Sequence, residues 1–215
     1  MILAAFALFA HARLPTKAGD QLLTFAENKG QWDARARFVA CASGLDLWLT
    51  DTGLVFDWHG PTRSRASDYL VSVVFVGATP KGHAVGLNPI PGPPKEKVHR
   101  FVKATVPNLY PGIDLVTYVD SQVGRPRYDL VVHIGANPNQ IRMRFKNAKH
   151  LLVDREGSVN YDTPFGHVRE TRQHSYQRRD FGPDYHFFPK EVLNPDGTIG
   201  FDVTGYRKDQ TLVID

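Results

Sequence analysis

Apolar and polar residues alternate with period two along most of this chain, and this pattern constrains its fold more than any other feature. The clearest case spans residues 45–58, where two alternating runs flank the sequence Asp-Thr-Gly at 51–53. Side chains that alternate in this way point to opposite faces of a strand, and Gly is typical of a hairpin turn. No window of helical length carries an apolar stripe of period 3.6, so we predict an all-β chain.

The same rhythm continues through the second half of the chain, with turn residues between short apolar runs. Residues 69–77 form a β-branched run, which predicts a central strand covered on both faces. Further strands are predicted at 113–119, 128–134, 140–145, 151–154, 158–162, 167–171, 198–203 and 212–214. Short antiparallel strands at this spacing predict a sandwich-like architecture.

A proline-rich run at 88–94 divides the chain, since proline cannot donate to a strand ladder. We therefore expect two lobes or one elongated body, with an N-terminal β lobe at 21–92, a connector at 93–112 and a C-terminal β lobe at 113–215. The 215 residues are 42% hydrophobic, and a chain of this size can bury a core without a disulfide or a metal.

The first ten residues are almost entirely apolar, and Ala10-His11-Ala12 follows them in the pattern that signal peptidases cleave. Ten apolar residues are too few to span a bilayer. We expect residues 1–20 to be an export signal and leader, with a structural first strand as the alternative. The mature protein would then be secreted or held at the cell surface, without stable insertion in the membrane.

The charge distribution gives little indication of a polyanionic partner. The net charge is +4, from 26 Lys and Arg intermixed with 22 Asp and Glu. Nucleic-acid-binding proteins cluster their cations, so we predict no nucleic-acid partner. Cys41 is the single cysteine and lies in an apolar run, where a thiol behaves as a small buried hydrophobe.

Asp51 begins the one Asp-Thr-Gly motif, which carries the catalytic carboxylate in aspartic peptidases. That chemistry needs two such carboxylates sharing a proton. A hairpin turn explains these three residues, and an aspartic peptidase-like homodimer remains the least favoured alternative. The histidines are dispersed without metal-ligand spacing, and phosphate-binding and nucleophile-elbow motifs are absent. We predict no catalytic residues, no metal site and no cofactor.

Two groups of residues are candidates for binding. Arg142, Arg144 and Lys146 alternate with apolar residues, so one face of their strand is a row of cations. Such a face is ordinarily solvated, but it also fits an acidic glycan or the carboxylates of a partner. Trp32 and Trp48 are candidates for a sugar-stacking platform, although the hairpin at 45–58 must bury one of its faces.

Several stretches, above all Glu-Asn-Lys-Gly-Gln-Trp at 27–32 and Tyr-Pro-Gly-Ile-Asp-Leu at 110–115, carry a resemblance to a known family. They resemble an uncharacterised bacterial β domain of large secreted or surface proteins, which commonly lies N-terminal to β-propeller-type repeats. The resemblance covers about residues 21–215 and implies an architecture and a setting, but no catalytic residues. The region before Tyr110 is shorter than in that family, and no downstream repeats follow.

These observations predict a non-catalytic structural or interaction module, part of or related to a larger multidomain surface protein. Its expected partners are neighbouring extracellular modules or a surface polymer. A module that binds acidic carbohydrate is the first alternative.

Overall fold

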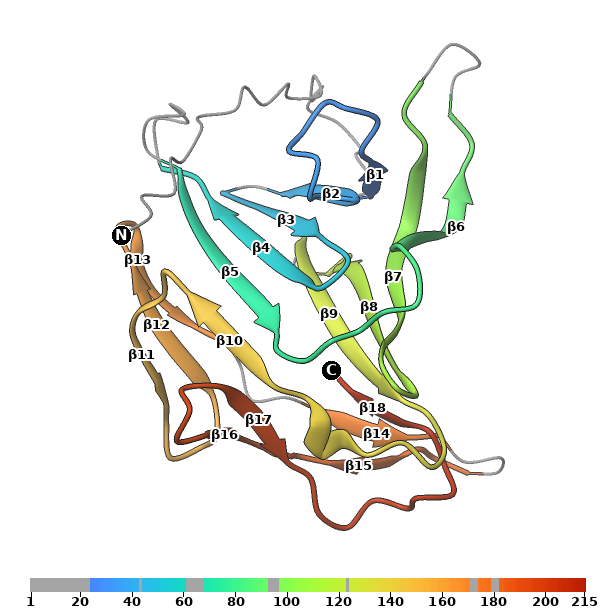
Figure 1. The fold of residues 1–215 in the computed structure, drawn as a ribbon, viewed down its shortest axis with the longest axis vertical. Helices are drawn as coiled ribbons and strands as arrows, with labels where there is room; N and C mark the ends of the chain where they lie inside the picture. Colours follow the sequence, from blue (N-terminus) through green and yellow to red (C-terminus); the bar gives the residue numbers. More distant parts are fainter. Residues whose placement is uncertain are drawn as a thin grey trace.

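The computed structural model describes residues 24–42, 44–60, 68–92, 97–122, 124–170, 174–178 and 182–215. The regular elements among these residues are β-strands, apart from one short 3₁₀ helix at Pro138–Gln140 (Figure 1). The predicted all-β, sandwich-like fold class is confirmed. The predicted export signal at 1–20 lies outside the described residues. Within the described part, no helix is both long and apolar enough to cross a membrane.

The strands form a large antiparallel sheet and a small three-stranded one. The large sheet contains β1 (Phe25–Glu27), β2 (Phe38–Ala42), β3 (Leu45–Leu49), β4 (Gly53–Trp58), β5 (Tyr69–Phe75), β6 (Val85–Ile90), β7 (Arg100–Tyr110), β8 (Ile113–Asp120), β9 (Arg125–Val132), β10 (Met143–Lys146), β14 (Ser175–Gln177), β15 (Tyr185–Phe187), β16 (Lys190–Leu193), β17 (Ile199–Asp202) and β18 (Leu212–Ile214). The small sheet contains β11 (Lys149–Val153), β12 (Val159–Thr163) and β13 (Gly166–Arg169).

The large sheet curls so that its two ends meet. Its strand order begins at β15 and ends at β16. Only Phe188 and Pro189 separate these strands in the chain, so the two ends of the sheet lie side by side (Figure 1). The inward faces of the curled sheet therefore enclose one core, which gives the sandwich-like shape.

The main hydrophobic core draws residues from almost the whole described chain, from β1 to β18. Phe25, Leu47, Leu115 and Leu212 are all fully buried members of it. This shared core fits one body better than two separate lobes. The long strand β7 spans residues 100–110 of the predicted connector at 93–112 and pairs with β1, β6 and β8.

The proline-rich run also differs from its prediction, because its first part pairs with β7 as strand β6. Pro89 lies opposite Phe101 in this ladder. Among the described residues β6 pairs with β7 alone, and an edge strand tolerates proline because one side of its backbone needs no partner. Gly86 is required there, since a Cβ at this position would lie 2.4 Å from the Phe101 ring.

The hairpin predicted at 45–58 is confirmed as β3 and β4, with Leu49 opposite Leu54 across the turn. Strand β5 is central in the sheet, as predicted, since it lies between β4 and β10. It is not covered on both faces, however: Val71 and Val73 are fully buried, whereas Leu70 is 40% exposed. The β-branched composition of β5 therefore reflects a half-buried strand.

Candidate functional site

Asn28, in the first family-like motif, organises the loop between β1 and β2. Its side-chain nitrogen donates to the carbonyl oxygens of Asp33 and Ala36, both at 2.8 Å. Its side-chain oxygen accepts from the backbone N–H groups of Gly30 and Trp32. One side chain thus satisfies backbone groups that a tight loop would otherwise leave unpaired.

This loop covers the outer face of β2 and β3 with a second, smaller apolar cluster. Trp32 and Trp48 lie inside it, 8% and 4% exposed, together with Val39 and Ala36. A buried ring offers no face to a sugar, so the two tryptophans considered for stacking are placed as packing residues. The motif at 27–32 therefore shapes and covers the sheet.

The second family-like motif, at 110–115, ties the β7–β8 hairpin to the end of β5. The hydroxyl of Tyr110 lies 3.0 Å from the carbonyl oxygen of Val76 and 3.2 Å from the backbone nitrogen of Arg142. It donates to the first and accepts from the second. Asp114 accepts from the backbone N–H of Asn108 at 2.7 Å. Both motifs therefore hold the fold together.

Asp51 lies in the turn between β3 and β4, as predicted, and its carboxylate is committed to neighbours. Arg37 donates to it from two nitrogens, at 3.0 and 2.8 Å, and the backbone N–H of Ala84 donates at 3.0 Å. His83 lies 2.8 Å away. Burial alone would raise the pKa of Asp51, but these hydrogen bonds outweigh it and lower the pKa, which keeps the group ionised.

The predicted cation row on β10 points outward. Ile141, Met143 and Phe145 are buried in the main core, while Lys146 is exposed and Arg142 and Arg144 are partly exposed. Arg144 lies 4.0 Å from Asp196, at the limit of an ion pair. The row is thus a largely solvated sheet face.

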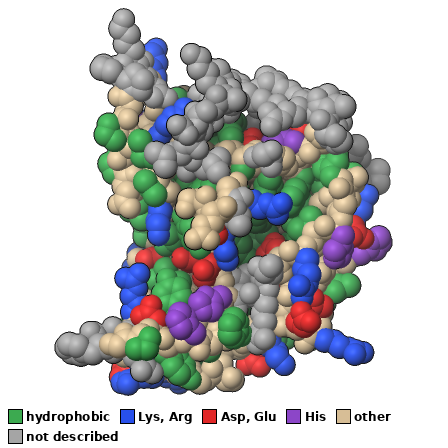
Figure 2. Space-filling view, turned by 180° about the vertical axis from the view of Figure 1, so that it is seen from behind, with side chains coloured by type: hydrophobic (Ala, Val, Ile, Leu, Met, Phe, Trp, Pro, Cys, Tyr) green, Lys and Arg blue, Asp and Glu red, His purple; other side chains and the backbone are tan. Residues whose placement is uncertain are grey.

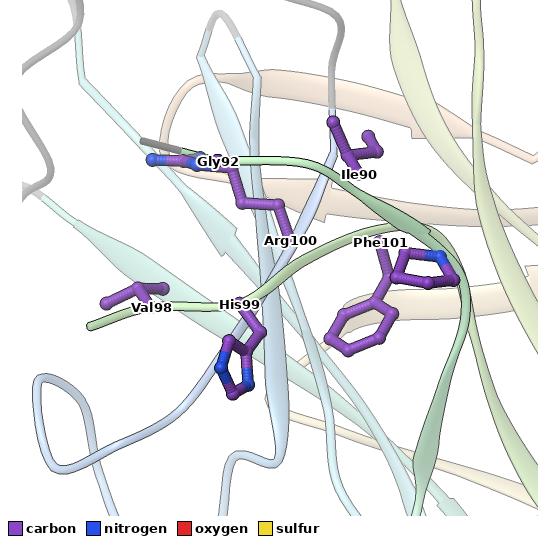
Figure 3. A pocket seen from close by; sticks show the side chains of 7 residues that line it. Ile90, Gly92, Val98, His99, Arg100 and Phe101 are labelled. Atoms are coloured by element: carbon purple, nitrogen blue, oxygen red, sulfur yellow. The ribbon is translucent and has the colours of Figure 1, made fainter. Parts of the chain in front are cut away.

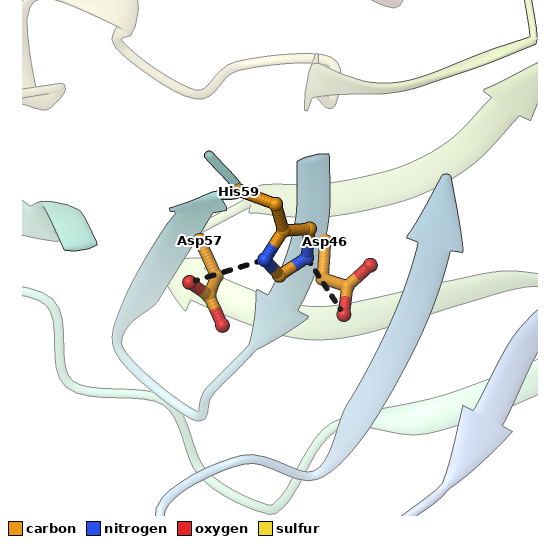
Figure 4. Close-up of side chains that lie close together, drawn as sticks. All are labelled: Asp46, Asp57 and His59. Carbon is orange, nitrogen blue, oxygen red and sulfur yellow. Dashed lines mark ion pairs between the residues drawn. The ribbon is translucent and has the colours of Figure 1, made fainter. Parts of the chain in front are cut away.

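A histidine between carboxylates is the most concentrated polar site on β3, β4 and β5. Asp46 on β3 and Asp57 on β4 are cross-strand partners, and His59 directly follows β4. The ring nitrogen Nε2 of His59 lies 3.2 Å from Asp46, and Nδ1 lies 4.0 Å from Asp57 (Figure 4). Nδ1 also lies 3.1 Å from Asp68. The side chains of His59 and Asp57 are only 8% and 9% exposed.

The carboxylates of this cluster favour a charged imidazole. Hydrogen bonding to Asp46 raises the pKa of His59 to about 9 against the effect of burial, and Asp68 and the charge of Asp57 add to the rise. With both ring nitrogens protonated, His59 donates toward carboxylates on its two sides. Three strand ends are thereby connected through one imidazolium.

The same three side chains also lie close enough together to be considered as a cation site. One ligand atom from each of Asp46, Asp57 and His59 lies within 4.8 Å of the others, which is close enough for a shared ion. In Figure 4, however, the carboxylates approach opposite nitrogens of the ring. Each nitrogen thus has a carboxylate as its nearest acceptor, at 3.2 Å for Asp46 and 3.1 Å for Asp68. The arrangement fits an imidazolium better than a metal ion.

The sequence analysis did not predict this cluster, although the register of the hairpin at 45–58 indicates part of it. Once the turn at 51–53 fixes the register of the hairpin, Asp46 and Asp57 must face each other, and His59 lies two residues further on the same face. Spacing along the chain gives no sign of this cluster. The partners of His59 come from cross-strand pairing instead.

The β6–β7 hairpin projects from the sheet (Figure 1), and a pocket lies along it (Figure 3). Its lining comes from both strands and the residues between them: Pro89, Ile90, Gly92, Val98, His99, Arg100 and Phe101. His99 lies 2.9 Å from Glu27, which also pairs with Lys29 at 2.6 Å. The pocket therefore adjoins the loop of the first motif.

The fold and these contacts define a class of protein: a curled, sandwich-like β domain whose sequence motifs build its turns. Within that class, the chain belongs to the family described as "Domain of unknown function (DUF7948)", whose model matches residues 25–215. No curated protein and no solved structure matches the chain.

Proposed function

We propose that this chain is a non-catalytic structural or interaction module of a larger exported protein at the cell surface. The observation that supports it is the use of the polar motif residues. Asn28 and Tyr110 hold loops, Asp51 pairs with Arg37, and His59 lies between carboxylates. These side chains hydrogen-bond or pair with neighbouring groups of the fold. They therefore stabilise a rigid scaffold and are not free to act as acids or bases on a substrate.

The projecting β6–β7 hairpin gives this module a surface for neighbours. Val85, Leu87 and Val102 on its two strands are 44%, 38% and 45% exposed. Exposed apolar side chains on an edge strand are a common feature of surfaces that contact other protein modules. The expected partners remain neighbouring extracellular modules or a surface polymer.

The proposal is tested first against the peptidase alternative. The purified chain is assayed for cleavage of casein between pH 3 and 7, beside an Asp51→Asn variant. We expect no cleavage above background in either protein, because Arg37 stabilises the ionised carboxylate. Turnover by the wild type that Asp51→Asn abolishes would establish the peptidase instead.

Export is tested in the source cells by fractionation with an antibody against the chain. We expect the protein in the medium or the surface fraction. A purely cytoplasmic distribution would contradict a surface module.

The acidic-glycan alternative keeps one supporting observation, the outward cation row of Arg142, Arg144 and Lys146. Its test is retardation of the chain in gels that contain alginate. Loss of retardation in an Arg144→Ala variant would favour this alternative over a purely structural role.

A further inference from the structure

Aromatic rings gather on the outward face of the sheet end formed by β14 and β15. Tyr176 lies opposite His186 in the ladder, and the ring of His174, just before β14, is 6.2 Å from that of Tyr176. The ring of Phe188 is 5.4 Å from that of His174. Phe188 is 56% exposed, His186 is exposed, and Tyr176 and His174 are partly exposed. We call these four residues the aromatic patch.

The two imidazoles of the patch lie side by side. Their centroids are 4.8 Å apart and their planes differ by 14°. Nδ1 of His186 is 2.9 Å from Nε2 of His174, which is a hydrogen-bond distance. The two imidazoles are therefore nearly parallel and in contact, and they hold each other in place within the patch.

A row of hydrogen-bonding side chains adjoins the aromatic patch on the same face, across β9 and β8. Asp215, which pairs with His174 through both backbone hydrogen bonds, accepts from the Tyr118 hydroxyl at 2.9 Å. Arg127 lies 3.1 Å from Asp215 and 3.3 Å from Asp120. Lys103 lies 5.2 Å from the centre of the Tyr118 ring.

The aromatic patch and the row of hydrogen-bonding side chains are close enough to interact electrostatically. Burial raises the pKa of Tyr176, and the charges of Asp129 and Asp215 raise it further. Figure 2 views the molecule from the side opposite to that of Figure 1. At its lower left, histidine side chains lie next to hydrophobic, acidic and basic side chains. One continuous surface therefore combines ring faces with paired charges.

Cations and carboxyl groups are mixed on this surface. Lys103, Arg125, Arg127 and Arg178 lie on it with Asp120, Asp129 and Asp215, and Arg125 is opposite Asp120 in the ladder. Burial raises the pKa of Asp129 to about 7, with the charge of Asp215 adding to the rise, so near neutrality this group carries only part of a charge. Because carboxyl groups lie among these cations and pair with them, the surface suits an uncharged ligand better than a polyanion.

We propose that the aromatic patch and the adjoining row of Asp215, Arg127 and Tyr118 bind an uncharged glycan. A pyranose ring places its C–H face on the aromatic side chains, and its neighbouring hydroxyls hydrogen-bond to the carboxylate and the guanidinium. This inference deepens the proposed interaction module, on which it rests, by giving it a class of ligand. It uses none of the residues predicted for glycan binding from the sequence.

The test is affinity electrophoresis of the full chain in gels containing xyloglucan, galactomannan, dextran or mixed-linkage β-glucan, with alginate as the acidic comparison. We expect at least one of the four neutral polysaccharides to retard the wild type. Removing one ring of the patch, in Tyr176→Ala or Phe188→Ala, should weaken this binding about 5- to 10-fold. Arg144→Ala is the matched control on β10 and should bind like the wild type.

Thermal melts of each variant separate lost binding from lost folding. Because Phe188 is well exposed, its variant should retain the wild-type melting temperature and carries the test if Tyr176→Ala is unstable. The proposal is overturned if no neutral polysaccharide retards the wild type, or if folded Phe188→Ala binds as well as the wild type. Retardation by alginate alone that depends on Arg144 would also overturn it. The cleavage and fractionation experiments address the module itself, so the two proposals can fail separately.

Discussion

Two clusters that contain histidine, one around His59 and one at the aromatic patch, differ mainly in exposure. The side chain of His59 is 8% exposed and lies between Asp46, Asp57 and Asp68. His186, at the other cluster, is exposed beside the rings of His174 and Tyr176. The same residue types therefore serve two purposes. In the first cluster burial commits them to the fold, and in the second exposure leaves them available for a ligand.

Replacing His59 should give the largest effect of any change to these clusters. His59→Gln removes the imidazolium and leaves carboxylates in a largely buried place, so we expect the free energy of unfolding to fall by about 3 kcal/mol at pH 6. Urea unfolding followed by circular dichroism measures it. The control is His83→Gln, since His83 is 73% exposed and also pairs with an aspartate. If both variants lose the same free energy of unfolding, burial does not explain the difference between the two histidines.

Asp129 should make the exposed face sensitive to pH. Its pKa is raised from 3.8 to about 7, so the folded state binds more protons than the unfolded state between these values. Stability should therefore fall as pH rises from about 4 to about 7. Asp129→Asn removes this effect, and we expect it to be more stable than the wild type at pH 8 by about 2 kcal/mol. If the two proteins lose stability equally between pH 4 and 8, Asp129 is not the group responsible.

The buried cluster should respond in a higher pH range. The pKa of His59 is raised from 6.5 to about 9, so its stabilising contribution is complete below about 6.5 and is lost as pH rises through 9. The difference in stability between the wild type and His59→Gln should shrink by about 1 kcal/mol between pH 6 and 10, after allowance for screening by solvent. The measurement is a series of urea unfolding curves over this range. A constant difference would show that His59 acts through packing alone.

The smallest effect is expected at the aromatic patch. His186→Ala removes an exposed ring, so the free energy of unfolding should change by no more than about 0.5 kcal/mol while glycan binding weakens. Thermal melts and affinity electrophoresis on the same preparation check both statements. A large loss of stability would show that His186 stabilises the fold, as His59 does, and would contradict this prediction.

The sequence predicts those parts of the structure that depend on local pattern. The hairpin at 45–58, the β-branched strand β5 and most strands of the second half follow from alternation and turn residues, whereas β14, β15 and β16 were not predicted. The turn containing Asp51 was predicted for the same reason. The alternation at Arg142, Arg144 and Lys146 likewise predicts their outward direction, since period two fixes the two faces of a strand.

The remaining features depend on contacts between distant segments. Strand β14 has only three residues and pairs with β18, more than thirty positions away, so no local signal marks it or the aromatic patch. The burial of Trp48 depends on the loop that Asn28 organises. Proline in β6 was mistaken for a break because an edge strand cannot be told from a linker by composition.

The most direct test of the account follows the His59 ring by NMR, as the chemical shift of its Cε1–H against pH. An imidazolium between carboxylates should stay protonated through neutral pH and titrate near 9. Signal assignment uses the His59→Gln variant. A midpoint near 6.5 would contradict the account, because the ring would then be neutral in the folded protein and could not join the three strand ends by charge.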